Sequence, residues 1–349
     1  MKFLFIHNTN NHLFYLMMSP NKSILIITLV LISQLGFSQY TDVINSNRPG
    51  VSRSAFSVGT NVAQLEVGPY MVNEKRTPSP AYEVSGLGVD FAARYGLLWE
   101  ELELNIEGTF QRDTKTFESE FATDDKRGNF KFLAVGAKYL VYDPYKNAED
   151  KKPNLYSWKA NQRFDWKSLI PAVSVYVGAN YDTPDNPYIT PGVEGFSPKV
   201  MIATQHNFSS GFVFVTNFIK DRIGTEQSDF QYILTLTRAF SPKWVAFIET
   251  QGIKSDFYAD NLFRIGGAYL MSKNFQLDTA VTLNIKDTPS VFNATIGASY
   301  RLDFHRDKEI NNGNSKNDII KRGGGKSKNK SNKTNDTMPK RRQKQSIDF

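Results

Sequence analysis

A regular alternation of apolar and polar residues near the end of the chain limits most strongly what it can fold into. Between residues 292 and 304, every second side chain is apolar, and the residues between them are polar or glycine. Successive side chains of a β-strand point to opposite faces, so this segment is predicted to be a strand with one apolar face. It is long enough to cross a bilayer at the tilt of barrel strands, which needs about 9–11 residues.

The same period of two recurs throughout the body of the chain, and the mean hydropathy of −0.41 excludes a bundle of membrane-spanning helices. Aromatic residues make up 13% of the chain, and several lie near strand ends, where interfacial girdles form. We expect an all-β fold, a single antiparallel transmembrane β-barrel of about 12 strands with a disordered C-terminal tail. The expected strands are 63–68, 87–95, 102–111, 130–142, 170–181, 199–207, 211–219, 229–240, 244–253, 261–271, 275–285 and 292–304.

The connections between these strands carry independent information. Those after the second, sixth, eighth and tenth strands are tight turns, whereas 112–128 and 182–198 are long and polar. Outer-membrane barrels have short periplasmic turns and longer external loops, so an even strand count predicts that both termini are periplasmic. The stretch 143–169 departs from this scheme because it is long where a short turn is expected, and it is predicted to hold a short helix around 159–167.

The N-terminus has the features of a signal peptide. Residues 23–37 are apolar, Lys22 precedes them, and the small residues Gly36 and Ser38 fit a cleavage site after Ser38. The apolar run is shorter than the roughly 20 residues of a membrane-spanning helix, which disfavours a retained anchor. The expected order is an N-terminal extension and signal peptide over 1–38, a periplasmic lead-in segment over 39–59, the barrel over 60–304 and a basic disordered tail over 305–349.

The tail, 305–349, holds the excess of positive charge. It has 13 Lys/Arg against 5 Asp/Glu, whereas residues 39–304 carry 27 against 30. Because the tail has few apolar residues to bury, it is predicted to be disordered. Basic runs such as 340–342 also occur in nucleic-acid-binding proteins, but an exported protein does not meet nucleic acid. We therefore expect the tail to contact anionic lipid headgroups or the cell-wall polymer.

A soluble all-β sandwich shows the same alternation, with its apolar face packed inward and its charges on the outside. The periodicity alone therefore does not decide between the two folds. The signal peptide, the length of the strands and the aromatic residues near strand ends favour the barrel.

The start of the body resembles a known family. Residues 47–56 read Asn-Arg-Pro-Gly-Val-Ser-Arg-Ser-Ala-Phe, and the sequence Gln-Leu-Glu-Val-Gly follows at 64–68. This is similar to the opening of an outer-membrane family catalogued under the meta-pathway of phenol degradation and often called simply "transporter". Its members begin with a Thr-Asp-Arg-Pro type segment, where this chain has Ser46 and Asn47 before the arginine. The resemblance implies an outer-membrane barrel, whereas the phenol label gives no substrate. Further similar stretches are 244–252 and 260–285.

The sequence offers little catalytic chemistry. The chain has no cysteine and only 4 histidines, which excludes a disulfide, a thiolate metal site and a cysteine nucleophile. His206, with Ser209 and Ser210 nearby, is the one candidate for a serine hydrolase. Its place at the end of an expected strand favours a polar residue at the rim of the barrel instead.

A group of acidic and amide side chains is the candidate for metal binding. Asp182, Asp185, Asn186 and Glu194 could chelate calcium weakly, but loops of this composition are usually only solvated. We predict no catalytic residue, no metal and no cofactor.

Charged residues on the polar faces of the expected strands are predicted to face the lumen. They carry both signs, and opposite charges in a narrow barrel attract each other strongly. We expect them to tie the interior together rather than to form a strongly ion-selective ring. The predicted lumen-facing residues are Asp90, Arg94, Glu101, Glu103, Glu107, Lys138, Arg238, Glu249, Arg264, Asp278 and Arg301.

The sequence predicts an outer-membrane β-barrel channel or transporter of a Gram-negative bacterium, with no enzymatic activity. About twelve strands enclose a narrow lumen, so the expected function is passive uptake or release of small solutes, which could include hydrophobic ones. The expected partners are outer-membrane lipids and an unidentified small solute, with no nucleic acid, and the protein is expected to be a monomer. The alternatives are a non-conducting outer-membrane structural or surface-interaction barrel with a plugged lumen, and a soluble secreted binding domain.

Overall fold

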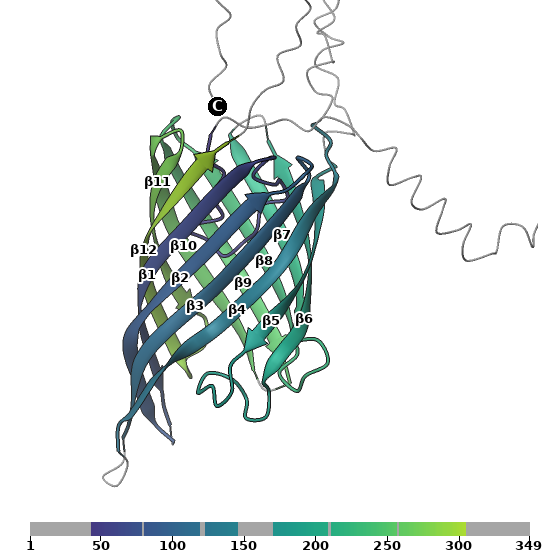
Figure 1. Ribbon diagram of the computed structural model, residues 1–349. Helices are drawn as coiled ribbons and strands as arrows, with labels where there is room; N and C mark the ends of the chain where they lie inside the picture. The colour runs from purple at the N-terminus through teal and green to yellow at the C-terminus, as the bar shows by residue number, and fades with distance from the viewer. Residues whose placement is uncertain are drawn as a thin grey trace, which may run out of the picture.

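The computed structural model describes residues 43–78, 80–118, 123–145, 170–208, 211–256 and 258–304. The predicted signal peptide, the helix expected around 159–167 and the basic tail lie outside these residues. Figure 1 shows tilted strands that wrap into a barrel.

Twelve antiparallel strands form the barrel, which confirms the predicted fold class. Each strand pairs with its neighbours in sequence, and β1 pairs with β12 to close the sheet. Closure leaves no free strand edge, so every strand has a backbone partner on both sides. The strands are β1 (Val62–Arg76), β2 (Tyr82–Gly96), β3 (Leu102–Phe117), β4 (Asp125–Tyr142), β5 (Ala172–Asp182), β6 (Gly195–Asn207), β7 (Phe212–Asp221), β8 (Asp229–Ala239), β9 (Trp244–Ser255), β10 (Ala259–Ser272), β11 (Phe275–Asn284) and β12 (Ser290–Asp303).

The barrel is mostly polar inside and apolar outside. In β1, Gln64 and Glu66 face the interior and are 1% and 3% exposed, whereas Leu65 and Val67 face outward and are 52% and 48% exposed. The other strands also carry large apolar side chains such as Ile296 on the outer surface. Their inner faces are mostly polar, apart from a buried apolar cluster on β5 to β8 that includes Tyr176, Met201 and Ile233. This arrangement is the reverse of a soluble sandwich, so that alternative is wrong, and it is the pattern of a barrel that spans a membrane. The described residues contain no helix that is both long enough and apolar enough to cross a membrane.

Four of the five connections at one end of the barrel are tight, but the fifth, 143–171, is the longest of all, and the opposite end also has short ones such as 256–258. The predicted alternation of short and long connections therefore holds only in part. The four tight turns are 97–101, 208–211, 240–243 and 273–274, and they lie at the end where β1 begins and β12 finishes. We call this the short-turn end, and the opposite one the far end. The longest connection whose residues are all described at the far end is 183–194.

The predicted polar loop over 112–128 is wrong. β3 continues to Phe117 and β4 begins at Asp125, so most of this stretch is a β-hairpin that extends the sheet. Oppositely charged residues face each other in this hairpin, because Asp113 pairs in register with Arg127 and Lys115 pairs with Asp125. Such cross-strand pairs stabilise a ladder without any apolar face, which is why hydrophobic periodicity did not reveal it. Figure 1 shows the hairpin projecting at the far end.

Residues 43–59 lie inside the barrel rather than outside it. The sequence suggested that 39–59 is a periplasmic lead-in to the first strand. Instead, the described part of this segment enters the lumen at the short-turn end, crosses it and returns to β1 (Figure 1). We call residues 43–59 the plug.

Candidate functional site

The plug follows an irregular path across the lumen and pairs with the barrel wall mainly through side chains. It enters beside the β10–β11 turn, where the Ile44 amide donates to the Lys273 carbonyl at 2.8 Å. Polar side chains then form hydrogen bonds with its backbone amides and carbonyls, and they come in turn from β1, β9, β7, β4 and β3. Backbone amides and carbonyls away from water need such partners, so the polar inner wall is what allows the chain to cross the lumen.

The carboxylate of Glu249 in β9 holds the turn of the plug. It accepts hydrogen bonds from the backbone amides of Val51 at 3.1 Å and Ser52 at 3.1 Å. It also accepts from Thr235 Oγ1 at 2.8 Å and from Arg264 Nη1 at 2.9 Å. Two amides, a hydroxyl and a guanidinium therefore satisfy one buried charge, which is the condition for burying it at tolerable cost.

A second cluster holds the part of the plug that returns to β1. Glu103 of β3 forms ion pairs with Arg94 of β2 at 2.9 Å and with Lys138 of β4 at 3.3 Å, and it accepts from the Val58 amide at 3.0 Å. Lys138 donates to the plug carbonyls of Ser54 and Phe56, both at 2.9 Å. Three adjacent strands thus carry a cation, an anion and a cation, which bind carbonyls and an amide of the plug backbone.

A third cluster joins Arg53 of the plug to β3, β6 and β7. The guanidinium of Arg53 pairs with Glu107 of β3, which also pairs with Lys199 of β6 at 3.3 Å. On β7, the Asn217 amide group accepts from the Arg53 backbone amide at 2.6 Å and donates to the Arg53 carbonyl at 2.8 Å. The Asn217 side chain therefore satisfies both backbone polar groups of Arg53, as a paired β-strand would.

Arg48 lies across the seam where the first and last strands meet. Its guanidinium is 3.3 Å from Asp278 of β11 and donates to Thr295 Oγ1 of β12 at 3.0 Å. A Cβ atom at Gly68 of β1 or at Gly297 of β12 would overlap this guanidinium. The two glycines thus form a notch in the closing pair of strands that the arginine fills.

Most of the predicted lumen-facing residues do point inward, and the structure gives many of them a specific role. Arg94, Glu103, Glu107, Lys138, Glu249, Arg264 and Asp278 contact the plug or a residue that contacts it. Asp90 accepts from Thr109, and Arg301 pairs with Asp303.

Two of the predicted residues lie elsewhere. Glu101 precedes β3 in a turn at the short-turn end instead of lying on the inner wall. Arg238 faces outward, because the inward positions of β8 are the odd-numbered ones, as buried Ile233 and Thr235 show. Its guanidinium lies 4.8 Å from the ring of Phe212 and 5.3 Å from that of Phe240.

Sequence reasoning missed the residues of the plug itself. Arg48 and Arg53 belong to no periodic segment, and only the family motif at 47–56 marked them. The role of these two arginines became clear only when the structure showed which charged side chains of the inner wall lie next to them.

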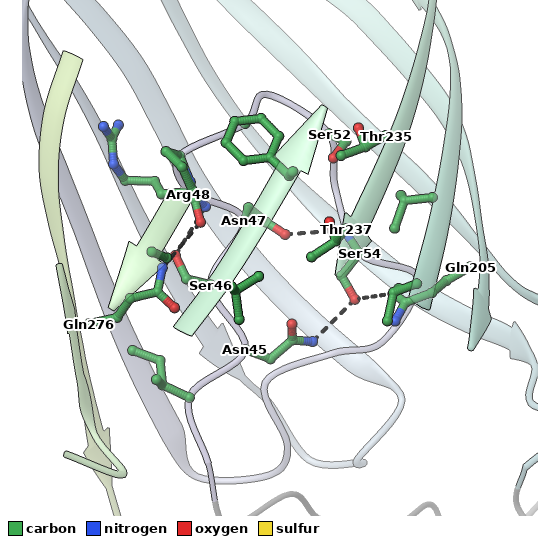
Figure 2. Close-up of a pocket in the computed structure, with 18 residues that line it drawn as sticks. Asn45, Ser46, Asn47, Arg48, Ser52, Ser54, Gln205, Thr235, Thr237 and Gln276 are labelled. Atoms are coloured by element: carbon green, nitrogen blue, oxygen red, sulfur yellow. Dashed lines mark hydrogen bonds between the residues drawn. The ribbon is translucent and has the colours of Figure 1, made fainter. Parts of the chain in front are cut away.

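A pocket remains between the plug and one side of the barrel. It has a volume of about 240 Å³ and lies between plug residues 44–54 and the inner faces of β6 to β11. Figure 2 shows the hydrogen bonds that fix its polar edge, from Asn45 to Ser54, from Ser54 to Gln205, and from Gln276 to the Arg48 carbonyl.

The loop 183–194 at the far end forms hydrogen bonds with the barrel wall. Asn186 Nδ2 donates to the Phe130 carbonyl at 2.6 Å, and the Tyr188 hydroxyl donates to the Gln111 carbonyl at 3.1 Å. Burial raises the pKa of the Tyr188 phenol, and the Asp113 carboxylate raises it further, so the hydroxyl keeps the proton that it donates. The loop is therefore anchored to the β3–β4 side of the barrel.

The candidate hydrolase and calcium residues do not form sites in the described part of the chain. His206 faces outward with its ring 4.3 Å from that of Phe208, and Ser209 and Ser210 lie outside the described residues. Asp182 pairs with Arg222 at 3.0 Å, and Asn186 is engaged as above. Within the described ranges there is no group of three His, Cys, Asp or Glu side chains that could hold a metal ion.

Several solved structures are similar to this chain at low identity. An outer membrane channel from Pseudomonas putida F1 has 9% identity and a TM-score of 0.47, covering 74% of this chain and 100% of that one. The P. putida toluene transporter TodX has 8% identity and a TM-score of 0.39, covering 70% and 91%. The translocator domain of the autotransporter NalP from Neisseria meningitidis has 10% identity and a TM-score of 0.42, covering 70% and 89%.

No curated protein matches the chain. One protein family does, over residues 46–302, and the match takes in most of the plug and the whole barrel except its last residue. The chain therefore belongs to the family described as "Putative MetA-pathway of phenol degradation".

Proposed function

We propose that this protein is an outer-membrane channel for passive movement of small solutes, held closed in the present structure by its own N-terminal plug. The barrel supports this, because its polar inner wall suits an aqueous lumen and its apolar outer wall suits lipid. The family membership is consistent with it.

The observation that carries the proposal is the way in which the plug is bound. Its contacts with the wall include many hydrogen bonds and ion pairs to side chains, such as those of Glu249 and Glu103, and the plug forms no strand of the barrel sheet. The apolar contacts are few and small, made mainly by Val51 and Ala55. Water can replace such partners one by one, whereas a strand of the barrel cannot leave without breaking the ladder. The plug can therefore withdraw while the barrel stays closed through β1 and β12.

A non-conducting structural or surface-interaction barrel is the second candidate, and the same plug favours it. The lumen charges are used to bind the plug, as Arg53 with Glu107 and Arg48 with Asp278 show. If the plug never leaves, the lumen has no transport role, and the loops at the far end become the functional surface.

Conductance in planar bilayers separates the two candidates. We expect the refolded wild-type protein to conduct rarely and the double variant Arg48→Ala/Arg53→Ala to open often, because two ion pairs that hold the plug are lost. The control is Arg127→Ala, which removes the 2.8 Å ion pair with Asp113 in the far-end hairpin and leaves the plug contacts intact. Absence of conductance in every variant, with correctly folded barrels, would establish the second candidate.

We further propose that the short-turn end and both termini face the periplasm and that the protein is a monomer. Four of the five connections at the end where the described chain begins and finishes are tight turns, and such turns are usual on the periplasmic side. The chain has no cysteine, so Asp185→Cys in the far-end loop introduces a single label. An impermeant maleimide should label this variant on intact cells, whereas Lys273→Cys at the short-turn end should react only after lysis. Light scattering of the detergent-solubilised protein tests the monomer.

A further inference from the structure

The pocket beside the plug has one apolar wall and one polar wall. The barrel contributes Val213 and Val215 from β7 and Val245 and Phe247 from β9. The plug contributes amide and hydroxyl groups, among them that of Ser52. Val213 and Val245 are half-buried and lie at the beginnings of their strands, so the pocket is reached from the short-turn end.

The lining of the pocket carries no available charge. Arg48 is the one ionisable side chain among the lining residues, and its guanidinium is paired with Asp278. Glu249, directly behind the plug turn, already accepts from two backbone amides, Thr235 and Arg264. A charged ligand would lose its hydration here without gaining a counter-charge, so the pocket selects uncharged molecules.

Two hydroxyl groups in the lining have no hydrogen-bond partner in the described part of the chain. They are those of Ser52, which is more than nine-tenths buried, and of Thr237 on β8. Other polar groups of the lining bond to one another, as Ser54 does with Gln205. Because both hydroxyls line the pocket, each can donate to or accept from a ligand placed there, in exchange for water.

The size of the pocket limits the ligand further. A cavity of about 150 Å³ accommodates benzene, and sites for drug-sized ligands begin at about 300 Å³. The volume of about 240 Å³ lies between these values and fits one six-membered ring with a short polar substituent.

We propose that this pocket binds an uncharged amphiphile of about one six-membered ring, with its ring against Val215 and Phe247 and its hydroxyl on Ser52 or Thr237. Because the plug forms one wall, the site exists only while the plug is in place. A ligand that binds only one of two states shifts the equilibrium towards that state, so occupancy holds the channel closed. This second statement rests on the proposed channel function, whereas the binding itself does not.

Fluorine NMR of 4-fluorobenzyl alcohol with the refolded full-length protein tests the binding. We expect Thr237→Val to weaken binding by about threefold to tenfold, the effect of one hydrogen bond between neutral groups. Ala268→Leu, which fills the pocket from β10, should abolish it. The matched control is Thr282→Val on the inner face of β11, outside the pocket, which should bind like the wild type. The charged analogue 4-fluorobenzoate should not bind.

Equal affinity of all these variants would overturn the proposed site, because it would show that the alcohol partitions into detergent or binds elsewhere. Binding of the benzoate as strongly as the alcohol would overturn the selection for uncharged ligands.

The effect on closure is tested with the plug-weakened variant Arg48→Ala/Arg53→Ala in planar bilayers. We expect 4-fluorobenzyl alcohol to lower the open fraction of this variant, and adding Ala268→Leu should remove that response. An unchanged open fraction in a channel that conducts would overturn the coupling alone. A variant that never conducts but still binds the alcohol would overturn the channel function and leave the binding site standing.

Discussion

Arg48 of the plug lies 3.3 Å from Asp278 of β11, and their side chains are 9% and 0% exposed. The pair connects the N-terminal segment to the end of the chain, since Arg48 also contacts β12 through Thr295. In the described part of the chain, Arg48 is the cation that neutralises Asp278. Arg48 therefore binds the plug at the seam where β1 and β12 close the barrel.

Arg48→Ala should open the channel more often than any other single change in the plug. Removal of one partner leaves Asp278 buried without its cation, at a cost of roughly 3–5 kcal/mol, and withdrawal of the plug relieves that cost by admitting water. Adding Asp278→Asn should restore much of the closed state. Single-channel recording of both variants provides the check, and an Arg48→Ala channel as quiet as the wild type would refute this role.

Gly68→Ala and Gly297→Ala should resemble Arg48→Ala although they leave every charge in place. A methyl group at either position would occupy the space of the Arg48 guanidinium, so the arginine must leave its notch or the seam must distort. Gly128→Ala is the matched control, because its new Cβ would lie 3.7 Å from Arg112 Cγ, an ordinary contact. Conductance and heat-modifiable migration should be measured together, so that an open channel is distinguished from an unfolded barrel.

The sequence was sufficient to predict the barrel because strands that span a membrane show a regular alternation of apolar and polar side chains. Each spanning strand must alternate, and β12 shows this clearly, with Ile296 outward and Ser299 inward. The strand ends beyond the membrane were underestimated, as in the extension of β3 to Phe117, because backbone pairing there needs no apolar face. The outward position of Arg238 was missed for a similar reason, since a cation near the rim can lie on aromatic rings without entering the lumen.

The plug was not predictable from periodicity. It has neither strand nor helix, and its conformation depends on side chains far away in sequence, such as Asn217 for Arg53 and Glu249 for Ser52. The mixed signs of the inner charges did indicate that they bind one another rather than an ion. What the sequence did not show is that the segment before β1 provides part of that binding.

Glu249→Gln should loosen the turn of the plug. The neutral side chain loses its charge-assisted bonds to the Val51 and Ser52 amides, each worth about 1.5–3 kcal/mol, and its ion pair with Arg264. Hydrogen exchange in the plug should accelerate roughly tenfold or more, as measured by mass spectrometry. Asp229→Asn is the control, because this buried carboxylate accepts from Gln231 in the same strand and does not contact the plug. The same acceleration in both variants would mean that general loss of inner charge, not the Glu249 contacts, controls the plug.

The orientation of the outer surface is tested by Ile296→Arg. Ile296 is 69% exposed near the middle of β12, and an arginine at the bilayer midplane of such a barrel costs about 2–4 kcal/mol. Phe304→Arg, just beyond the same strand at the short-turn end, should cost only about 0–1 kcal/mol, because the side chain reaches the interface there. Unfolding by guanidinium in lipid vesicles measures both values. Because Ile296 would contact water in a soluble protein, an arginine there would then be harmless, so equal stability of the two variants would show that lipid does not surround this face.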